Sequence, residues 1–298
     1  MTLMRKRAVR WSILAISLLL VGAVGVFLFY TPSSCFPPVP QPNGYEALTR
    51  ASSKLVRPLD SVKALSTEKL AEALDGNRAA LEEVRHALQV PGVVSVQMSE
   101  SWFTVHTPQL MNLKAAAFVL DGEADLRSRR GDTNGALLSA LDCLRLGEAI
   151  QRGGVFIDFL VGSACELIAV HRMTNLVTSL GPEDCKKALL ALQEHEARKD
   201  SLEGIQRREK EWSRRTFSIW KRVGAAIRPK AGTEFVTSDV VKDYNSRTRQ
   251  LRLVLLSIAA RVYELERGTA PAKAADLVPA YLQQLPLDPA TGKPLELK

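Results

Sequence analysis

The chain has 298 residues, of which 46% are hydrophobic and 24% are charged, and this length can bury the core of one large domain or two small ones. Its formal net charge is +8, but the basic residues gather in two patches, at residues 5–10 and 207–230. No recognition motif accompanies either patch, so the charge does not indicate nucleic acid as a partner.

The first predicted element is an apolar segment at residues 11–30, which contains no Asp, Glu, Lys, Arg or His. A helix of about twenty residues rises about 30 Å, which matches the hydrocarbon core of a bilayer. The bulky residues 27–30 are unlike the small residues of a cleavage site. We therefore expect a transmembrane helix that remains in the lipid bilayer. The alternative is lipidation of Cys35, which Pro32, three positions before it, disfavours.

The charges around this segment predict its orientation. Basic residues precede it, whereas no Lys or Arg follows until Arg50. By the positive-inside bias, we expect residues 1–10 in the cytoplasm and residues 31–298 on the periplasmic or extracytoplasmic side of a bacterial inner membrane. The proline-rich residues 31–44 are then expected to form a semi-rigid stalk.

Residues 45–237 are predicted to form a helical body. Residues 66–91 carry leucines at helical spacing and divide into two short helices near Asp75. Residues 93–108 are rich in β-branched and aromatic side chains, which predicts an extended connector or a weak hairpin.

Residues 110–154 predict two helices that are joined by a turn at Gly131 and Asp132. The residues with the strongest pattern are Ala124 and Arg130 before the turn and Ala136, Ala140, Cys143 and Leu144 after it. This stretch resembles one tetratricopeptide-like hairpin, whose small residues let two antiparallel helices approach closely. Because a solenoid needs about three repeats, a hairpin within a bundle is favoured over a peptide-binding superhelix.

Residues 155–177 predict a buried core helix and not a second membrane crossing, because Asp158 and Glu166 lie within them. These carboxylates and His171 come closest to a catalytic cluster, but about 12 Å of helix separates the carboxylates, which is too far for a glycosidase pair. No metal-ligand, nucleotide or nucleophile motif is found elsewhere. The sequence thus predicts no catalytic residue, no cofactor and no metal ligand. Either one disulfide or buried free thiols are compatible with Cys35, Cys143, Cys165 and Cys185.

Residues 205–230 predict a basic amphipathic helix with aromatic side chains, which can lie in a membrane interface. This hypothesis assigns contact with anionic lipid or an acidic cell-wall polymer to Trp212, Arg214, Arg215, Trp220, Lys221 and Arg222. The alternative is a helix that packs on the bundle and exposes a solvated basic face.

A long helix is predicted from about residue 238 to residue 267, followed by a C-terminal cap whose prolines prevent a continuous helix. The distinctive residues are Tyr263, Gly268, Leu277, Val278, Tyr281, Leu282, Pro286, Asp288, Pro289, Gly292 and Pro294. This stretch resembles the segment after the long helix of type II secretion major pseudopilins. The chain begins MTLMRKRAVRW and lacks the processed pseudopilin start, so the resemblance does not imply pilus assembly. The whole arrangement is similar to a group of uncharacterised bacterial membrane-anchored proteins, which implies no catalytic residues.

These elements together predict a mostly α-helical protein with a transmembrane helix, a stalk, a tetratricopeptide-like helical bundle and an irregular cap. We expect a single-pass membrane-anchored protein with an interaction or scaffolding role toward a protein partner, and no enzymatic activity. The alternatives are an accessory component of a secretion or pilus-like system and, least favoured, an exported hydrolase.

Overall fold

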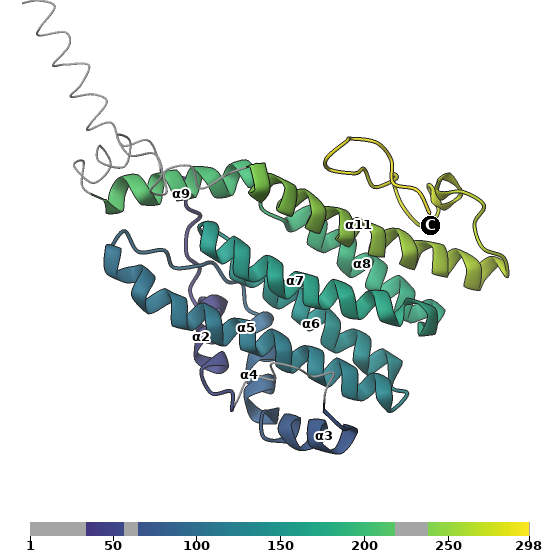
Figure 1. Ribbon diagram of the computed structural model, residues 1–298, viewed down its shortest axis with the longest axis horizontal. Helices are drawn as coiled ribbons and strands as arrows, with labels where there is room; N and C mark the ends of the chain where they lie inside the picture. Colours follow the sequence, from purple (N-terminus) through teal and green to yellow (C-terminus); the bar gives the residue numbers. More distant parts are fainter. Residues whose placement is uncertain (1–33, 57–64, 218–237, 298) are drawn as a thin grey trace, which may run out of the picture. The chain divides into compact units, whose positions relative to one another are not determined.

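The computed structural model describes residues 34–56, 65–217 and 238–297. Within these ranges the chain forms α-helices and short 3-10 turns and no β-strand, which confirms the all-α prediction (Figure 1). The α-helices are α2 (Gly44–Ser52), α3 (Thr67–Asp75), α4 (Arg78–Leu88), α5 (Glu100–Arg129), α6 (Thr133–Gln151), α7 (Phe156–Leu176), α8 (Pro182–Arg198), α9 (Leu202–Thr216) and α11 (Ser238–Arg267). The 3-10 turns are η2 (Val177–Ser179) and η3 (Ala274–Leu277).

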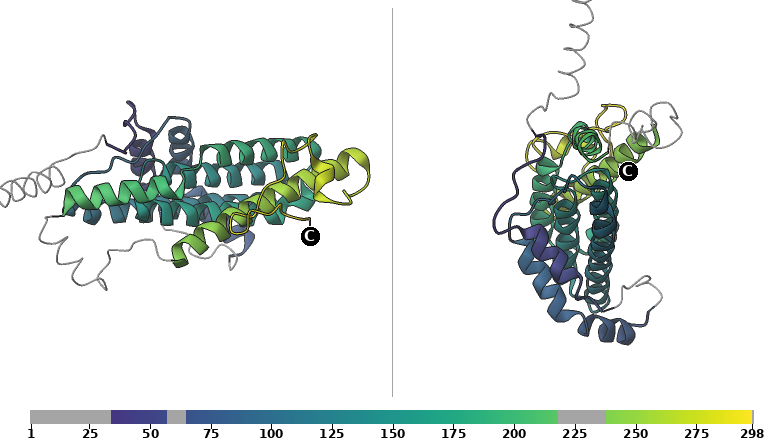
Figure 2. Two further views of the ribbon diagram at one scale, coloured as in Figure 1. Left: turned by 90° about the horizontal axis from the view of Figure 1, so that it is seen from above. Right: turned by 90° about the vertical axis from the view of Figure 1, so that its left-hand side faces the viewer.

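Helices α5, α6 and α7 pack against one another and form the centre of the compact unit that begins at Phe36. The short helices α2, α3 and α4 cover one side of this centre, whereas α8 and α11 cover the other side (Figures 1 and 2). The consecutive helices α5, α6 and α7 therefore lie side by side, as short connections between antiparallel helices require, whereas α8 packs against α6 and α11.

The predicted hairpin at residues 110–154 is present as α5, a tight turn and α6. Gly131 takes a positive φ of 77°, and Asp132 begins α6 by accepting a hydrogen bond from the Gly135 amide at 2.8 Å. Helices α6 and α7 then approach very closely. A Cβ atom added at Gly162 of α7 would lie only 2.6 Å from the carbonyl oxygen of Gly147 of α6. The two facing glycines thus set the distance between the central helices.

The expected extended connector at residues 93–108 is wrong in its second half, because α5 begins at Glu100. Ser99 caps the helix by accepting a hydrogen bond from the Ser101 amide at 3.2 Å. The intrinsic helix propensity of Trp102 is low, but its side chain is 5% exposed in the core. The apolar area that the helical conformation buries therefore outweighs the low propensity. The helix even continues through Pro108, which removes one backbone donor.

The predicted membrane anchor and localisation require correction. None of the helices within residues 34–56, 65–217 and 238–297 has the length and apolar character needed to cross a membrane. The predicted transmembrane segment, residues 11–30, lies outside the described residues. We therefore do not retain the inner-membrane anchor or the assignment of residues 31–298 to the extracytoplasmic side.

The predicted stalk at residues 31–44 is also corrected, because the compact unit already begins at Phe36. The Asn43 side chain donates to the Val93 carbonyl at 2.9 Å and accepts from the Val93 amide at 3.0 Å. A buried side chain with two such bonds fixes this segment to the helical body. Residues 36–43 are therefore part of the fold and not a free spacer.

Residues 268–297 follow α11 and fold back on it without forming another α-helix. Leu277 and Leu282 are 0% and 2% exposed, and Tyr281 packs edge-on against Tyr263. Asp288 is held by Arg249 at 2.9 Å. The segment is thus an ordered cap whose apolar side chains are buried.

Candidate functional site

A cleft of about 630 Å³ opens between α3, α4 and α5. This volume lies within the range of about 300 to 1,000 Å³ that is typical of ligand sites. Helix α3 lines it with Ala71, Glu72, Leu74 and Asp75. Helix α3 packs against the end of α5 (Figure 1). It therefore forms one wall of the cleft.

The second wall is the face of α4 that carries Arg78, Leu81, Glu82 and Arg85. These residues lie at positions i, i+3, i+4 and i+7, which places all four side chains on one side of a helix. Seven steps along a helix rise about 10 Å, so this wall is about two turns long.

The third wall is the end of α5, which repeats the same spacing with Glu123, Leu126, Arg127 and Arg130. In both helices a leucine lies between charged residues, so the two rows of side chains, which we call stripes, have the same arrangement. The cleft therefore has charged rims of both signs on either side of an apolar floor.

The leucines of the floor are already buried. Leu74, Leu81 and Leu126 are 7%, 3% and 7% exposed. Since the hydrophobic effect is proportional to the apolar area removed from water, covering them further contributes little. The charged side chains above the floor are therefore the groups that can distinguish one ligand from another.

Arg85 fixes the wall of α4 against the α5–α6 hairpin. Its guanidinium is paired with Glu123 and lies 2.9 Å from Asp142 of α6. Glu123 also accepts hydrogen bonds from Ser139 at 2.7 Å and Arg127 at 3.1 Å. Burial opposes ionisation of Glu123, but Ser139 and Arg85 outweigh this effect and lower its pKa. The cleft is thus built on a fixed, charged framework.

Other charges of the cleft are available for a ligand. Glu72, Glu82 and Arg130 are exposed and have no ion-pair partner within the described ranges. Among the described residues Arg78 pairs with Asp75 alone, and both side chains are more than two-thirds exposed, at 73% and 68%. Exposed pairs of this kind contribute little to stability, so a ligand can replace them at small cost.

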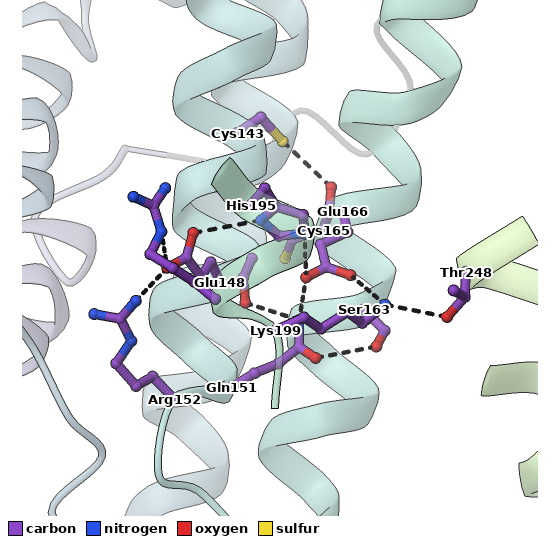
Figure 3. A network of polar contacts seen from close by, with 12 residues as sticks. Cys143, Glu148, Gln151, Arg152, Ser163, Cys165, Glu166, His195, Lys199 and Thr248 are labelled. Atoms are coloured by element: carbon purple, nitrogen blue, oxygen red, sulfur yellow. Dashed lines mark hydrogen bonds and ion pairs between the residues drawn. The ribbon is translucent and has the colours of Figure 1, made fainter. Parts of the chain in front are cut away.

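A second group of polar side chains lies in the core between α6, α7 and α8 (Figure 3). His195 of α8 is 2% exposed and points between two glutamates, with Nδ1 3.4 Å from Glu148 and Nε2 3.2 Å from Glu166. The contact with Glu148 has hydrogen-bond geometry, whereas the contact with Glu166 is an ion pair alone. Gln151 donates to Glu166 at 2.5 Å, and Lys199 lies 3.7 Å from it.

The charges of this core network compensate one another. Burial lowers the pKa of His195, but the contacts with Glu148 and Glu166 outweigh burial and raise the pKa to about 9. The same contacts lower the pKa of both glutamates against the effect of burial. The accompanying cavity measures about 10 Å³, which is room for about one water molecule. The network therefore joins helices and leaves no space for a substrate.

A second buried histidine pairs with Asp158 at the start of α7. His106 Nε2 lies 2.5 Å from Asp158 Oδ1, and the ring stacks on Trp102 at 4.2 Å. Asp158 also accepts a hydrogen bond from the Val155 amide at 2.8 Å. As predicted, α7 is a core helix, with Asp158 0% exposed. Asp158 and Glu166 belong to different networks, and His171 is exposed beside Asn175.

The residues predicted to contact an anionic surface are only partly described. Trp212 is 4% exposed, donates its indole N–H to Gln97 at 3.0 Å and packs against Trp102. Arg215 lies 2.5 Å from Glu211, and Arg214 is half-buried on the same helix. Trp220, Lys221 and Arg222 lie outside the described residues, so contact of this patch with an anionic surface stays a prediction.

Sequence reasoning missed both the cleft and the core network. His195 lies between two glutamates in the sequence, at 194 and 196, but its partner Glu148 is 47 positions away on another helix. For the cleft, a usable signal was present in the repeated spacing of charged residues around Leu81 and Leu126. All four cysteines are free thiols, and three of them are buried.

The chain was compared with protein-family models, with curated proteins and with solved structures, and none of the three comparisons gave a match. The resemblances to tetratricopeptide hairpins, to pseudopilins and to membrane-anchored bacterial proteins gain no support from them.

Proposed function

We propose that this protein is an interaction module and that the cleft between α3, α4 and α5 holds a short segment of a partner protein. The observation that carries the proposal is the pairing of two similar helix stripes, on α4 and α5, around one open groove of about 630 Å³. Its rims keep exposed charges, Glu72, Glu82 and Arg130, without partners in the described ranges.

The shape of the groove favours a helix as occupant. Side chains at i, i+3, i+4 and i+7 form ridges on α4 and α5, and the ridges of a third helix fit between such rows. A groove about 10 Å long takes about two turns of helix. Because an isolated helix of that length is marginal in water, the segment belongs to a folded partner or folds on binding.

A crosslinking experiment in the cells that make the protein tests this function. A photoreactive amino acid replaces Glu82, on the exposed rim of the cleft, in the full chain. A matched control carries it at Glu194, which is exposed on α8 and does not line the cleft. We expect crosslinks at residue 82 to one defined segment of a partner, none at residue 194, and their loss on adding Arg130→Glu. Equal labelling at both positions, or crosslinks unaffected by Arg130→Glu, would contradict the proposal.

A further inference from the structure

The charged side chains of the cleft differ in how firmly the protein itself holds them. Arg85 is fixed between Glu123 and Asp142, so it supports the wall and is not free to turn toward a ligand. Arg127 lies 3.1 Å from Glu123 and is 35% exposed. Glu123 keeps the hydrogen bonds from Arg85 and Ser139 when Arg127 leaves, so Arg127 can be released at small cost.

Arg127 lies on the last turn of α5, Arg130 is the C-cap residue of that helix, and both line the cleft. A guanidinium group can donate two parallel hydrogen bonds to one carboxylate, so each of these arginines suits an acidic side chain. The other two walls carry Glu72 of α3 and Glu82 of α4, which are exposed carboxylates without partners in the described parts of the chain. An acidic ligand alone would be repelled there, and a basic ligand alone would be repelled by the arginines.

We infer that the segment bound in the cleft carries both charges: an acidic side chain facing Arg127 and Arg130, and a basic side chain facing Glu72 and Glu82. This inference rests on the proposed function and specifies its ligand. The acidic and basic groups lie on different sides of the bound helix, because Arg127 and Arg130 belong to the α5 side of the cleft, whereas Glu72 and Glu82 belong to α3 and α4. On those two helices Arg78 and Asp75 neutralise each other. Specificity then comes from charge pattern, since the leucine floor is already buried.

Four helical peptides of about twelve residues test the inference. They share one leucine stripe and differ at two positions on opposite flanks, which carry Glu and Lys, Glu and Gln, Gln and Lys, or Gln and Gln. Binding to the full chain is measured by fluorescence anisotropy. We expect the Glu/Gln and Gln/Lys peptides each to bind about tenfold more tightly than the Gln/Gln peptide, since one charge-assisted hydrogen bond accounts for about that factor, and the Glu/Lys peptide to bind most tightly of the four.

Variants of the protein then test which of its side chains contacts the acidic group of the peptide. Arg130→Glu should weaken the Glu/Lys and Glu/Gln peptides about tenfold and leave the Gln/Lys peptide no weaker. The control is Arg50→Glu, at an exposed arginine that does not line the cleft, and it should change none of the four affinities. Arg130 is exposed and unpaired in the described structure, so melting curves of both variants should match that of the unaltered chain.

The peptide experiment distinguishes failure of the charge pattern from failure of the docking site. Equal binding of all four peptides, with no effect of Arg130→Glu, would overturn the charge pattern and keep the cleft as a docking site. No saturable binding of any peptide up to about 1 mM would overturn the docking site itself, because affinities weaker than that are below about 4 kcal/mol.

Discussion

His195 should make folding stability depend on pH. Its pKa is raised from 6.5 to about 9 in the folded protein. A difference of about 2.5 units corresponds to about 3 kcal/mol, and His195 is 2% exposed, so solvent does not screen this contribution. Because the folded-state pKa is the higher one, the contribution is complete below pH 6.5 and is lost as pH rises through about 9.

Urea unfolding of the full chain between about pH 6 and pH 9.5 measures this effect. His195→Gln removes the titrating group, and the difference between the two stability curves isolates its contribution. We expect the free energy of unfolding of the unaltered chain to fall by about 3 kcal/mol relative to the variant across this range. His86→Gln, at an exposed histidine, is the control and should give a curve parallel to that of the unaltered chain. Parallel curves for His195→Gln as well would refute a buried, charged His195.

Two further changes test the packing of the fold. Gly162→Ala should destabilise the protein by about 1 to 3 kcal/mol in urea unfolding, because the new Cβ would lie 2.6 Å from the Gly147 carbonyl. The control is Gly76→Ala, whose new Cβ would meet nothing nearer than 3.8 Å and which should therefore lower the free energy of unfolding far less. Equal losses of stability in the two variants would contradict the close approach of α6 and α7. Ending the chain after Pro279 should lower the melting temperature and expose α11 to protease, since it removes Leu282, whose burial contributes roughly 1.5 to 3 kcal/mol. An unchanged melting curve would show that the cap does not stabilise the body.

The helices that could be predicted from the sequence are those whose signals are local. The Gly131 turn, the break near Asp75 and the span of α11 depend on caps, glycines and leucine spacing that lie next to one another in the chain. The start of α5 was missed because its residues favour strand, and only burial of Trp102 against distant helices favours helix there.

The candidate site could be predicted less well. Its stripes on α4 and α5 are visible as repeated spacings, but their meeting around one cleft depends on Arg85, whose partners Glu123 and Asp142 are distant in sequence. Single-helix patterns cannot show which charges a neighbouring helix will neutralise. The structure shows that neighbouring helices hold Arg85 in ion pairs, whereas Arg127 and Arg130 stay available to a ligand.

A titration of the full chain with the Glu/Lys peptide tests most directly whether the cleft between α3, α4 and α5 is the docking site that we propose. The chain is labelled at leucine methyl groups and the titration is followed by NMR. We expect saturable shifts of the methyl signals of Leu74, Leu81 and Leu126, and unchanged signals for Leu192 and Leu256 in the core on the α8 and α11 side. Unchanged signals of the three cleft leucines, or shifts spread equally over all five, would contradict the proposed docking site.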